Sequence, residues 1–325
     1  MSFGELKYKL ILGVFLLSIP LLAIYFNGGK ALHGILHGFD VDWKTNDNMD
    51  IHNLKVNYGV YDPEKKFSPS NGLSFDHYYY RWEQFDPLKF KTDMAYSVQK
   101  NRWPLITLEP FLKEGRSVDS LFSDILHGQY DSIIQNVYTS IKEFGKPVMF
   151  RWGHEMEKVT GRYPWASKDY VGYVNSYRYV VNKFKPLKPN IFFIWSPIGN
   201  IDLYNYWPGP DYVDFTGLSV YSFSEWDNKY YEGRRPFSNM FREKYDLVNV
   251  LGKPIMITEF GVDGDDKSQV TWLKNAFESF KDFPNLRSLI YFNAKDSQDA
   301  WGKEFSTPDW HINSTVFNRK KAGNE

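Results

Sequence analysis

Eight short, β-rich apolar runs recur along this chain, and several of the stretches between them have helical periodicity. The runs are Val56–Tyr61, His77–Trp82, Pro104–Pro110, Val148–Trp152, Ile191–Ser196, Phe215–Tyr221, Ile255–Glu259 and Leu289–Asn293. Apolar residues at helical spacing predict helices over Asp131–Phe144, Ser167–Phe184 and Lys267–Lys281. This alternation is typical of βα units around a parallel sheet. Eight such units predict an α/β fold, a (β/α)8 TIM barrel, as a single domain over residues 51–318.

The N-terminus carries an uncharged apolar run, residues 10–26, directly behind Lys7 and Lys9. The run is longer than a usual signal-peptide core and no good cleavage site closes it, so an uncleaved transmembrane anchor is favoured over a removed signal. The preceding lysines predict a cytoplasmic tail over residues 1–9 and a single-pass protein whose barrel is extracytoplasmic. Residues 27–50, rich in Gly, His, Asn and Asp, predict a linker to the barrel.

The amino-acid composition limits the kinds of partner and of catalytic or metal site that this chain can have. The 39 basic and 39 acidic residues balance, so no global field attracts nucleic acid, and a neutral partner is favoured. The absence of cysteine excludes disulfides, thiolate nucleophiles and thiolate metal sites. His154-Glu155 does not begin a zinc-protease motif, because the required second histidine is replaced by Lys158. We therefore expect no cofactor and no metal; the acidic turn at residues 263–266 could bind calcium but is more typical of a helix cap.

Polar or aromatic residues close several of the predicted strands, and in a (β/α)8 barrel these strand ends form the mouth where chemistry takes place. Residues at or just beyond such ends are Trp82, Glu109, Arg151, His154, Glu155, Tyr221 and Glu259. A strand-end glutamate can simply cap a helix or join a salt bridge. Two that face each other across the mouth, with carboxyl groups about 5 to 5.5 Å apart, would suit a double-displacement glycosidase.

Three ordered motifs carry a family resemblance. The first is Phe150–Met156 with Tyr163-Pro164-Trp165, the second is residues 207–214 running into 217–221, and the third is Ile257–Gly261. The first resembles the Arg-x-x-His-Glu-Met signature of glycoside hydrolase family 26, whose best-known members are endo-β-1,4-mannanases. The other two are similar to that family's approach to strand six and its nucleophile strand. The resemblance spans residues 55–295 in the family's order.

The resemblance implies a retaining endo-β-glycanase with Glu155 as acid/base and Glu259 as nucleophile. The implied substrate-binding and supporting residues are Arg151, His154, Tyr163, Trp165 and Tyr221, and the strand ends add Glu109 and Trp82. Tyr221 is expected to hydrogen-bond the nucleophile. Tyr163 and Trp165 would either stack on sugar rings or pack beneath a loop.

Two departures leave the polysaccharide open. Residues 157–160 stand where typical mannanases have Asn-Gly and tryptophans, and Phe292-Asn293 stands where many relatives have a tryptophan. The expected substrate is mixed-linkage β-glucan, mannan or an exopolysaccharide, with a slight lean toward the lichenase-like members. Expected partners are that polysaccharide, the membrane through the N-terminal helix, and polysaccharide synthesis machinery as a further candidate. The alternative is a non-hydrolysing glycan-binding or scaffolding barrel of a polysaccharide synthesis or export system.

Overall fold

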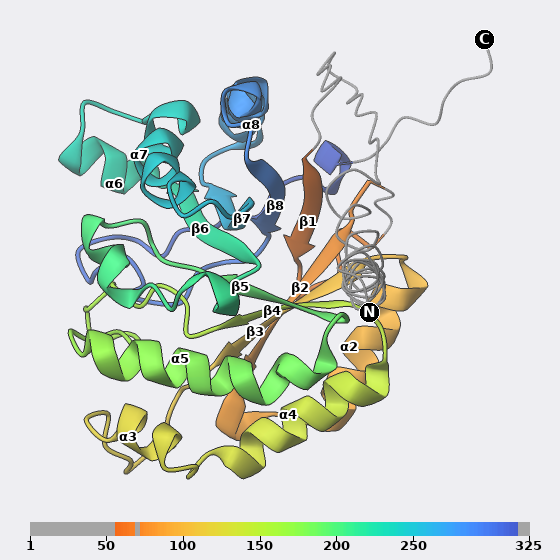
Figure 1. Ribbon diagram of the computed structural model, residues 1–325. Coiled ribbons are helices and arrows are strands. Elements are labelled where there is room, and N and C mark those ends of the chain that lie inside the picture. The colour runs from red at the N-terminus through yellow and green to blue at the C-terminus, as the bar shows by residue number, and fades with distance from the viewer. Residues whose placement is uncertain (1–55, 69–71, 318–325) are drawn as a thin grey trace, which may run out of the picture. The chain divides into compact units, whose positions relative to one another are not determined.

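The computed structural model describes residues 56–68 and 72–317. Eight parallel strands close into a barrel in sequence order, each paired with the next and β8 paired with β1 (Figure 1). The strands are β1 (Asn57–Tyr61), β2 (Phe75–Arg81), β3 (Trp103–Glu109), β4 (Val148–Trp152), β5 (Ile191–Trp195), β6 (Phe215–Ser222), β7 (Ile255–Val262) and β8 (Leu286–Phe292). The predicted (β/α)8 barrel is confirmed.

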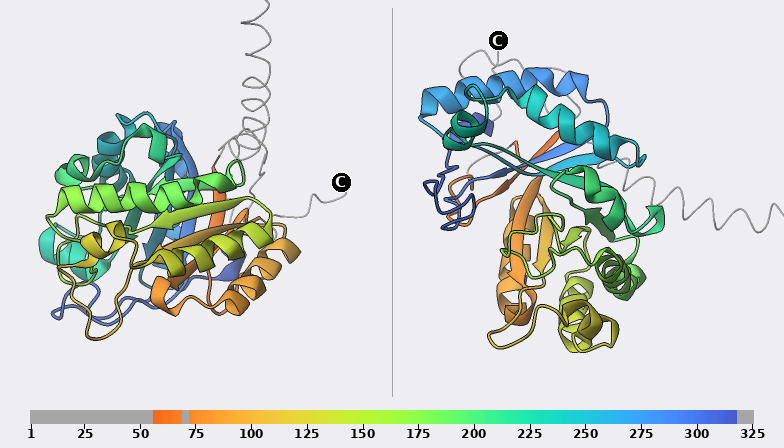
Figure 2. Two further views of the ribbon diagram at one scale, coloured as in Figure 1. Left: turned by 60° about the horizontal axis from the view of Figure 1, so that its bottom comes forward. Right: turned by 90° about the vertical axis from the view of Figure 1, so that its left-hand side faces the viewer.

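In the described residues, β5 is followed by 3-10 turns, whereas α-helices follow β2, β3, β4, β6 and β7 and lie on the outside of the barrel (Figure 2). They are α2 (Pro87–Gln99), α3 (Leu121–Leu126), α4 (Asp131–Phe144), α5 (Tyr170–Phe184), α6 (Ser224–Tyr230), α7 (Phe237–Asn249) and α8 (Asp266–Ser279), with short 3-10 turns η1 (Trp82–Gln84), η2 (Lys185–Leu187), η3 (Ile201–Tyr206), η4 (Pro210–Tyr212), η5 (Phe280–Asp282) and η6 (Ser314–Phe317). Helix α4 has its predicted bounds and ends at Gly145, whose φ of 65° is the left-handed conformation that glycine adopts readily.

Strand β7 continues three residues beyond its predicted end at Glu259. Phe260 and Val262 are buried and pair with β6, opposite Val220 and Ser222. Glu259 is therefore inside the last half of the strand rather than at its final residue. Glu259 pairs with Ser219 of β6, and the register shifts beside it in the pairing with both β6 and β8, so Glu259 lies at a local irregularity of the sheet.

The acidic turn before α8 acts as a helix cap. Asp265 accepts a hydrogen bond from the backbone N–H of Ser268 at 2.8 Å. Asp263 forms an ion pair with Arg234 at 2.6 Å, so the turn's carboxylates have protein partners. Across residues 56–68 and 72–317, no group of three His, Asp or Glu side chains could hold a metal ion.

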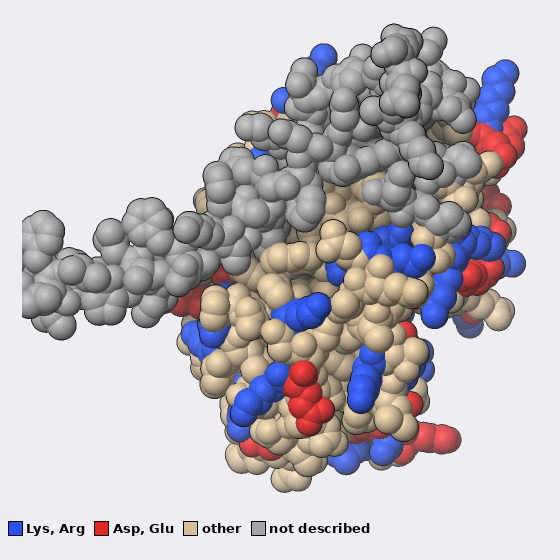
Figure 3. Space-filling view, turned by 90° about the vertical axis from the view of Figure 1, so that its right-hand side faces the viewer, with Lys and Arg blue, Asp and Glu red and all other residues tan. Residues whose placement is uncertain are grey.

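The predicted tail (1–9), anchor (10–26) and linker (27–50) lie outside the described residues. Within the described part, none of the helices combines the length and apolarity needed to cross a bilayer. On the face drawn in Figure 3, basic and acidic side chains are interspersed among uncharged ones, in line with the balanced composition.

Candidate active site

A fully buried guanidinium, that of Arg151, organises the interior near the barrel mouth. Strand register aligns Tyr79, Thr107 and Arg151 on β2, β3 and β4. Arg151 donates hydrogen bonds to Thr107 Oγ1 at 2.7 Å, Thr258 Oγ1 at 3.1 Å, the Tyr79 hydroxyl at 3.1 Å and Glu259 Oε1 at 2.7 Å. Burial alone would lower the pKa of Arg151, but Tyr79 and Glu259 raise it, so the group stays charged. Its orientation toward Glu259 is fixed.

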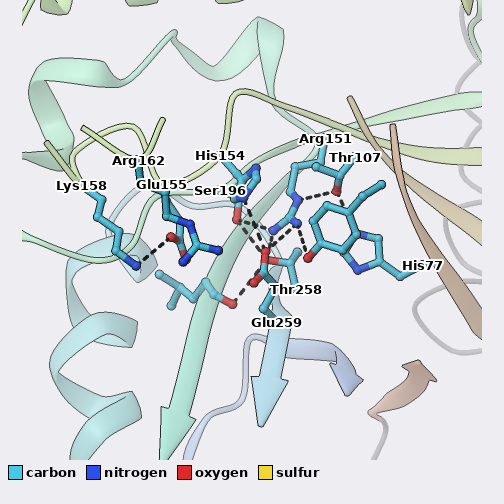
Figure 4. Close-up of polar contacts among 12 residues, drawn as sticks. His77, Thr107, Arg151, His154, Glu155, Lys158, Arg162, Ser196, Thr258 and Glu259 are labelled. Carbon is cyan, nitrogen blue, oxygen red and sulfur yellow. Dashed lines mark hydrogen bonds and ion pairs between the residues drawn. The ribbon is translucent and has the colours of Figure 1, made fainter. Parts of the chain in front are cut away.

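Two donors hold the Glu259 carboxylate, one on each oxygen, and Figure 4 shows the Arg151 contact. Arg151 donates to Oε1, and the Tyr221 hydroxyl donates to Oε2 at 2.8 Å. Burial, with the charge of Glu259, raises the pKa of Tyr221, which keeps that hydroxyl protonated as a donor. His154 Nε2 lies 3.7 Å from Oε1. Burial first, and then Arg151, lowers the pKa of His154 well below its usual value, so this contact is made by a neutral ring. The expected Tyr221 to nucleophile hydrogen bond is present.

Glu155 lies in a strained turn that follows β4. Its φ is 52°, and that of Gly153 is 54°, so both residues adopt the left-handed conformation. For a residue other than glycine this costs on the order of 1 to 3 kcal/mol and persists only where the surroundings impose it. Here the Glu155 backbone N–H donates to Ser196 O at 2.8 Å, which ties the turn to the end of β5. Such strain is typical of functional positions, and it directs this carboxyl to the same side-chain cluster as Glu259 (Figure 4).

The charge state of Glu155 is set by two opposing effects. Burial raises its pKa, but the Lys158 ammonium, 3.6 Å from Oε2, is the largest of the effects that lower it below its usual value, and the Arg162 guanidinium is a smaller one. In this state Glu155 is an ionised carboxylate at neutral pH. A general acid must instead carry a proton when it meets the glycosidic oxygen.

Glu109 ends β3 and brings a third carboxyl to the site. Burial raises its pKa to about 7, against the lowering effect of Arg151 and together with the raising effect of Glu259. Its electrostatic coupling to both members of the Arg151–Glu259 pair supports its predicted place at the mouth. No acid-base ion pair within 4.0 Å is formed by Glu109 among the described residues.

The predicted aromatic contacts divide into two groups. Trp82 is 1% exposed, stacks on Tyr130 with ring centroids 4.3 Å apart and donates to Phe111 O. Trp165 is 0% exposed and donates from Nε1 to His154 O at 2.6 Å. Both tryptophans are thus buried supports, and this placement does not favour the sugar contacts expected of them. Tyr163 stacks on Trp165 and has its ring 5.1 Å from that of His154, so it lies closer to the carboxylates.

Several residues of the site were not singled out from the sequence. Arg162, in the loop after β4, donates to Ser297 Oγ at 3.1 Å and lies 3.6 Å from Asp296, so it links this loop to the loop after β8. Thr107 and Thr258 support Arg151 from inside the barrel. A hydroxyl residue in the middle of an otherwise apolar barrel strand is the signal that could have identified both threonines.

Comparison with known proteins finds a match between part of this chain and one protein family. Residues 110–257 match the model of glycosyl hydrolase family 26, a stretch that includes Glu155 and Tyr221 and ends before Glu259. The chain is 25% identical over 273 residues to endoglucanase H of Acetivibrio thermocellus, covering 77% of this chain and 27% of that protein. It is 25% identical over 217 residues to the β-1,3-xylanase TXYA of a Vibrio species, covering 60% of this chain and 46% of the relative.

A third relative and a solved structure complete the comparison. The mannan endo-1,4-β-mannosidase of Bacillus subtilis is 27% identical over 191 residues, 54% of this chain and 44% of that protein. This chain thus spans between about a quarter and a half of the length of these curated relatives. Among solved structures, a family 26 β-mannanase from Bacteroides ovatus superposes with a TM-score of 0.57 at 15% identity, over 81% of this chain and 87% of that one, a likeness of fold.

Proposed function

We infer that this chain is a member of glycoside hydrolase family 26 and hydrolyses a β-linked polysaccharide internally and with retention of configuration. The observation that carries the proposal is the Glu259 carboxylate, fixed by Arg151 and Tyr221 at 2.7 and 2.8 Å. A nucleophile must be ionised and oriented at the moment of attack, and two donors on different oxygens achieve both.

In this mechanism Glu259 attacks the anomeric carbon while Glu155 protonates the departing glycosidic oxygen. The covalent glycosyl-enzyme is then hydrolysed by water, which gives a proton to Glu155 as it attacks. Arg151 and Tyr221 stabilise the Glu259 carboxylate when it leaves the sugar again. Asp or glutamate pairs perform both steps without a cofactor.

A binding barrel is the second candidate function, and one observation favours it. Glu155 is ion-paired with Lys158 at 3.6 Å, which is an arrangement for a fixed carboxylate rather than for a proton donor. A non-hydrolysing member of a polysaccharide synthesis or export system would need only that the sugars bind. The retained Arg151–Glu259–Tyr221 arrangement favours hydrolysis, because binding alone has no use for an oriented nucleophile.

A panel of soluble β-glycans tests both candidates. We expect mixed-linkage β-glucan or an exopolysaccharide to be cut at least about tenfold faster than β-1,4-mannan, since the residues after Met156 and at Phe292 depart from the mannanase pattern. Early products of mixed length would indicate internal cleavage. Galactomannan as the best substrate would refute the substrate preference, and tight binding without any product would support the binding barrel.

We also propose that residues 10–26 anchor the protein in the membrane with the barrel outside the cytoplasm. The uncharged run behind Lys7 and Lys9 supports this topology. The full chain is expected to sediment with membranes and to resist extraction by high salt, which removes proteins held by charge alone. A secreted form whose N-terminus begins beyond residue 27 would contradict the proposal.

A further inference from the structure

Three cations surround the two catalytic carboxyl candidates, and their partners differ. Arg151 is paired with Glu259 at 2.7 Å, and Arg162 is 3.6 Å from Asp296. Lys158 is 3.6 Å from Glu155, which is the one acidic group within 4.0 Å of its ammonium in the described part of the chain. Arg162 keeps Asp296 as its partner during catalysis. Arg151 loses the charge of Glu259 in the covalent intermediate but keeps hydrogen bonds to three hydroxyl groups, those of Tyr79, Thr107 and Thr258. The only acidic partner of Lys158 within 4.0 Å among the described residues is the group that has to gain and lose a proton.

Charge balance changes when Glu155 takes up its proton. Protonated Glu155 no longer neutralises the charge of Lys158, whose side chain is 25% exposed. The Trp301 ring, 6.0 Å away, offers only a weak cation–π contact. The half-buried Lys244 also lies nearby, with Nζ donating to Ser219 O at 2.7 Å. With Glu155 protonated, no other acidic group of the described residues lies within 4.0 Å of the Lys158 ammonium, so an anion brought by the substrate can form a charge-assisted hydrogen bond with it.

The turn that presents Lys158 is fixed on both sides. The Lys158 backbone N–H donates to Glu155 O at 3.0 Å. Next to it, Glu157 is buried and its Oε1 accepts from the Gly199 N–H at 2.9 Å. Lys158 is therefore held beside the acid/base candidate by its backbone, and its side chain, which is 25% exposed, directs the ammonium to the Glu155 carboxylate (Figure 4).

We propose that Lys158 recognises a carboxylate on the sugar next to the cleaved bond, so that the natural substrate is an acidic polysaccharide. The substrate carboxylate replaces Glu155 as the partner of Lys158, and Glu155 becomes free to carry the proton that the leaving oxygen needs. A neutral glycan leaves Lys158 on Glu155 and is cut slowly. This inference rests on the proposed hydrolase function and deepens it.

The test compares matched acidic and neutral substrates. A β-glucan whose C6 alcohols have been oxidised to carboxylates, and a pyruvylated β-glycan, are each assayed beside the same polymer after chemical reduction or removal of its carboxyl groups. For the wild type we expect kcat/KM at least about tenfold higher on an acidic form than on its neutral match. The two acidic polymers distinguish a uronate from a ketal-linked carboxylate as the group recognised.

Three variants identify the residue responsible. Lys158→Met should reduce the acidic-over-neutral ratio to about one, while Lys158→Arg, which keeps the charge, should preserve most of it. The matched control is Lys168→Met, which removes a lysine from the same βα loop, where it is 61% exposed and paired with Asp202 at 2.6 Å. The control should keep the wild-type ratio. Circular dichroism verifies that each variant is folded.

Binding to the inactive Glu259→Gln variant separates this inference from the proposed function. Calorimetry should give tighter binding of the acidic oligosaccharide, and adding Lys158→Met should abolish the difference. Hydrolysis of both forms at equal rates, with a ratio unchanged in Lys158→Met, would overturn the role of Lys158 and leave the hydrolase intact. Acid-selective binding by a wild type that cuts no glycan would refute hydrolysis and keep the recognition site. Equal or undetectable binding of both forms would overturn the recognition site.

Discussion

Glu259→Ala should lower turnover by at least about 10⁴-fold on every substrate, including aryl glycosides with good leaving groups. No other carboxylate of the described site is held by two donors as Glu259 is by Arg151 and Tyr221, so no group can take over the attack. A good leaving group reduces the need to protonate the departing oxygen. It cannot replace Glu259, which supplies the attack and not that proton. Initial rates on a natural glycan and on an activated aryl glycoside should therefore fall together.

The alanine variant needs a folded control. Removing Glu259 leaves the fully buried Arg151 without its counter-charge, a change that typically destabilises a protein by about 3 to 5 kcal/mol. Glu259→Gln keeps the shape and one acceptor oxygen and should lose activity with a smaller fall in melting temperature. If the folded Glu259→Gln variant turned over substrate at the wild-type rate, this residue would not be the nucleophile.

Strand and helix positions were predictable where sequence and packing agree. Strand β4 and helix α4 have their predicted bounds, because a Gly-Lys-Pro segment ends the helix and a fully buried apolar run follows. The prediction failed at the end of β7, where it stopped at the polar Glu259. Pairing with β6 continues to Val262, and only the neighbouring strand supplies that information.

The tryptophans illustrate a different limit. A predicted strand end places Trp82, and a sequence motif places Trp165, close to the barrel mouth, but neither signal says which way the ring turns. Trp82 turns toward Tyr130 and Trp165 toward the His154 backbone, so both fill space under the site. Large rings bury much apolar area, and packing competes with ligand contact for each of them.

Local charge could not be derived from composition. The balanced totals of 39 basic and 39 acidic residues favour a neutral partner, yet the cluster around Glu155 contains Lys158, Arg162 and the half-buried Lys244. From sequence, Lys158 excluded a zinc-protease motif and belonged to the stretch, residues 157–160, that departs from the mannanase pattern. Its importance depends on the left-handed turn at Glu155, which brings residues three apart into ionic contact.

Glu155→Ala should behave differently from Glu259→Ala, and the difference tests the assignment of the two roles. On a natural glycan the loss of acid and base help should slow turnover by about 10² to 10⁴-fold. An aryl glycoside with a good leaving group needs little protonation, so Glu259 should still attack it. The glycosyl-enzyme should then accumulate, because no base activates water, and a burst of released phenol should be followed by slow turnover.

Added azide should restore steady turnover of Glu155→Ala on that aryl glycoside, because azide attacks the glycosyl-enzyme without giving up a proton. It also gains access to space that the Glu155 carboxylate occupies beside Lys158, and the Lys158 ammonium favours the anion. The glycosyl azide should have the β configuration, since two inversions at the anomeric carbon give retention. An α-glycosyl azide would mean single displacement, and equal losses on natural and activated substrates in a folded variant would mean that Glu155 does not donate the proton.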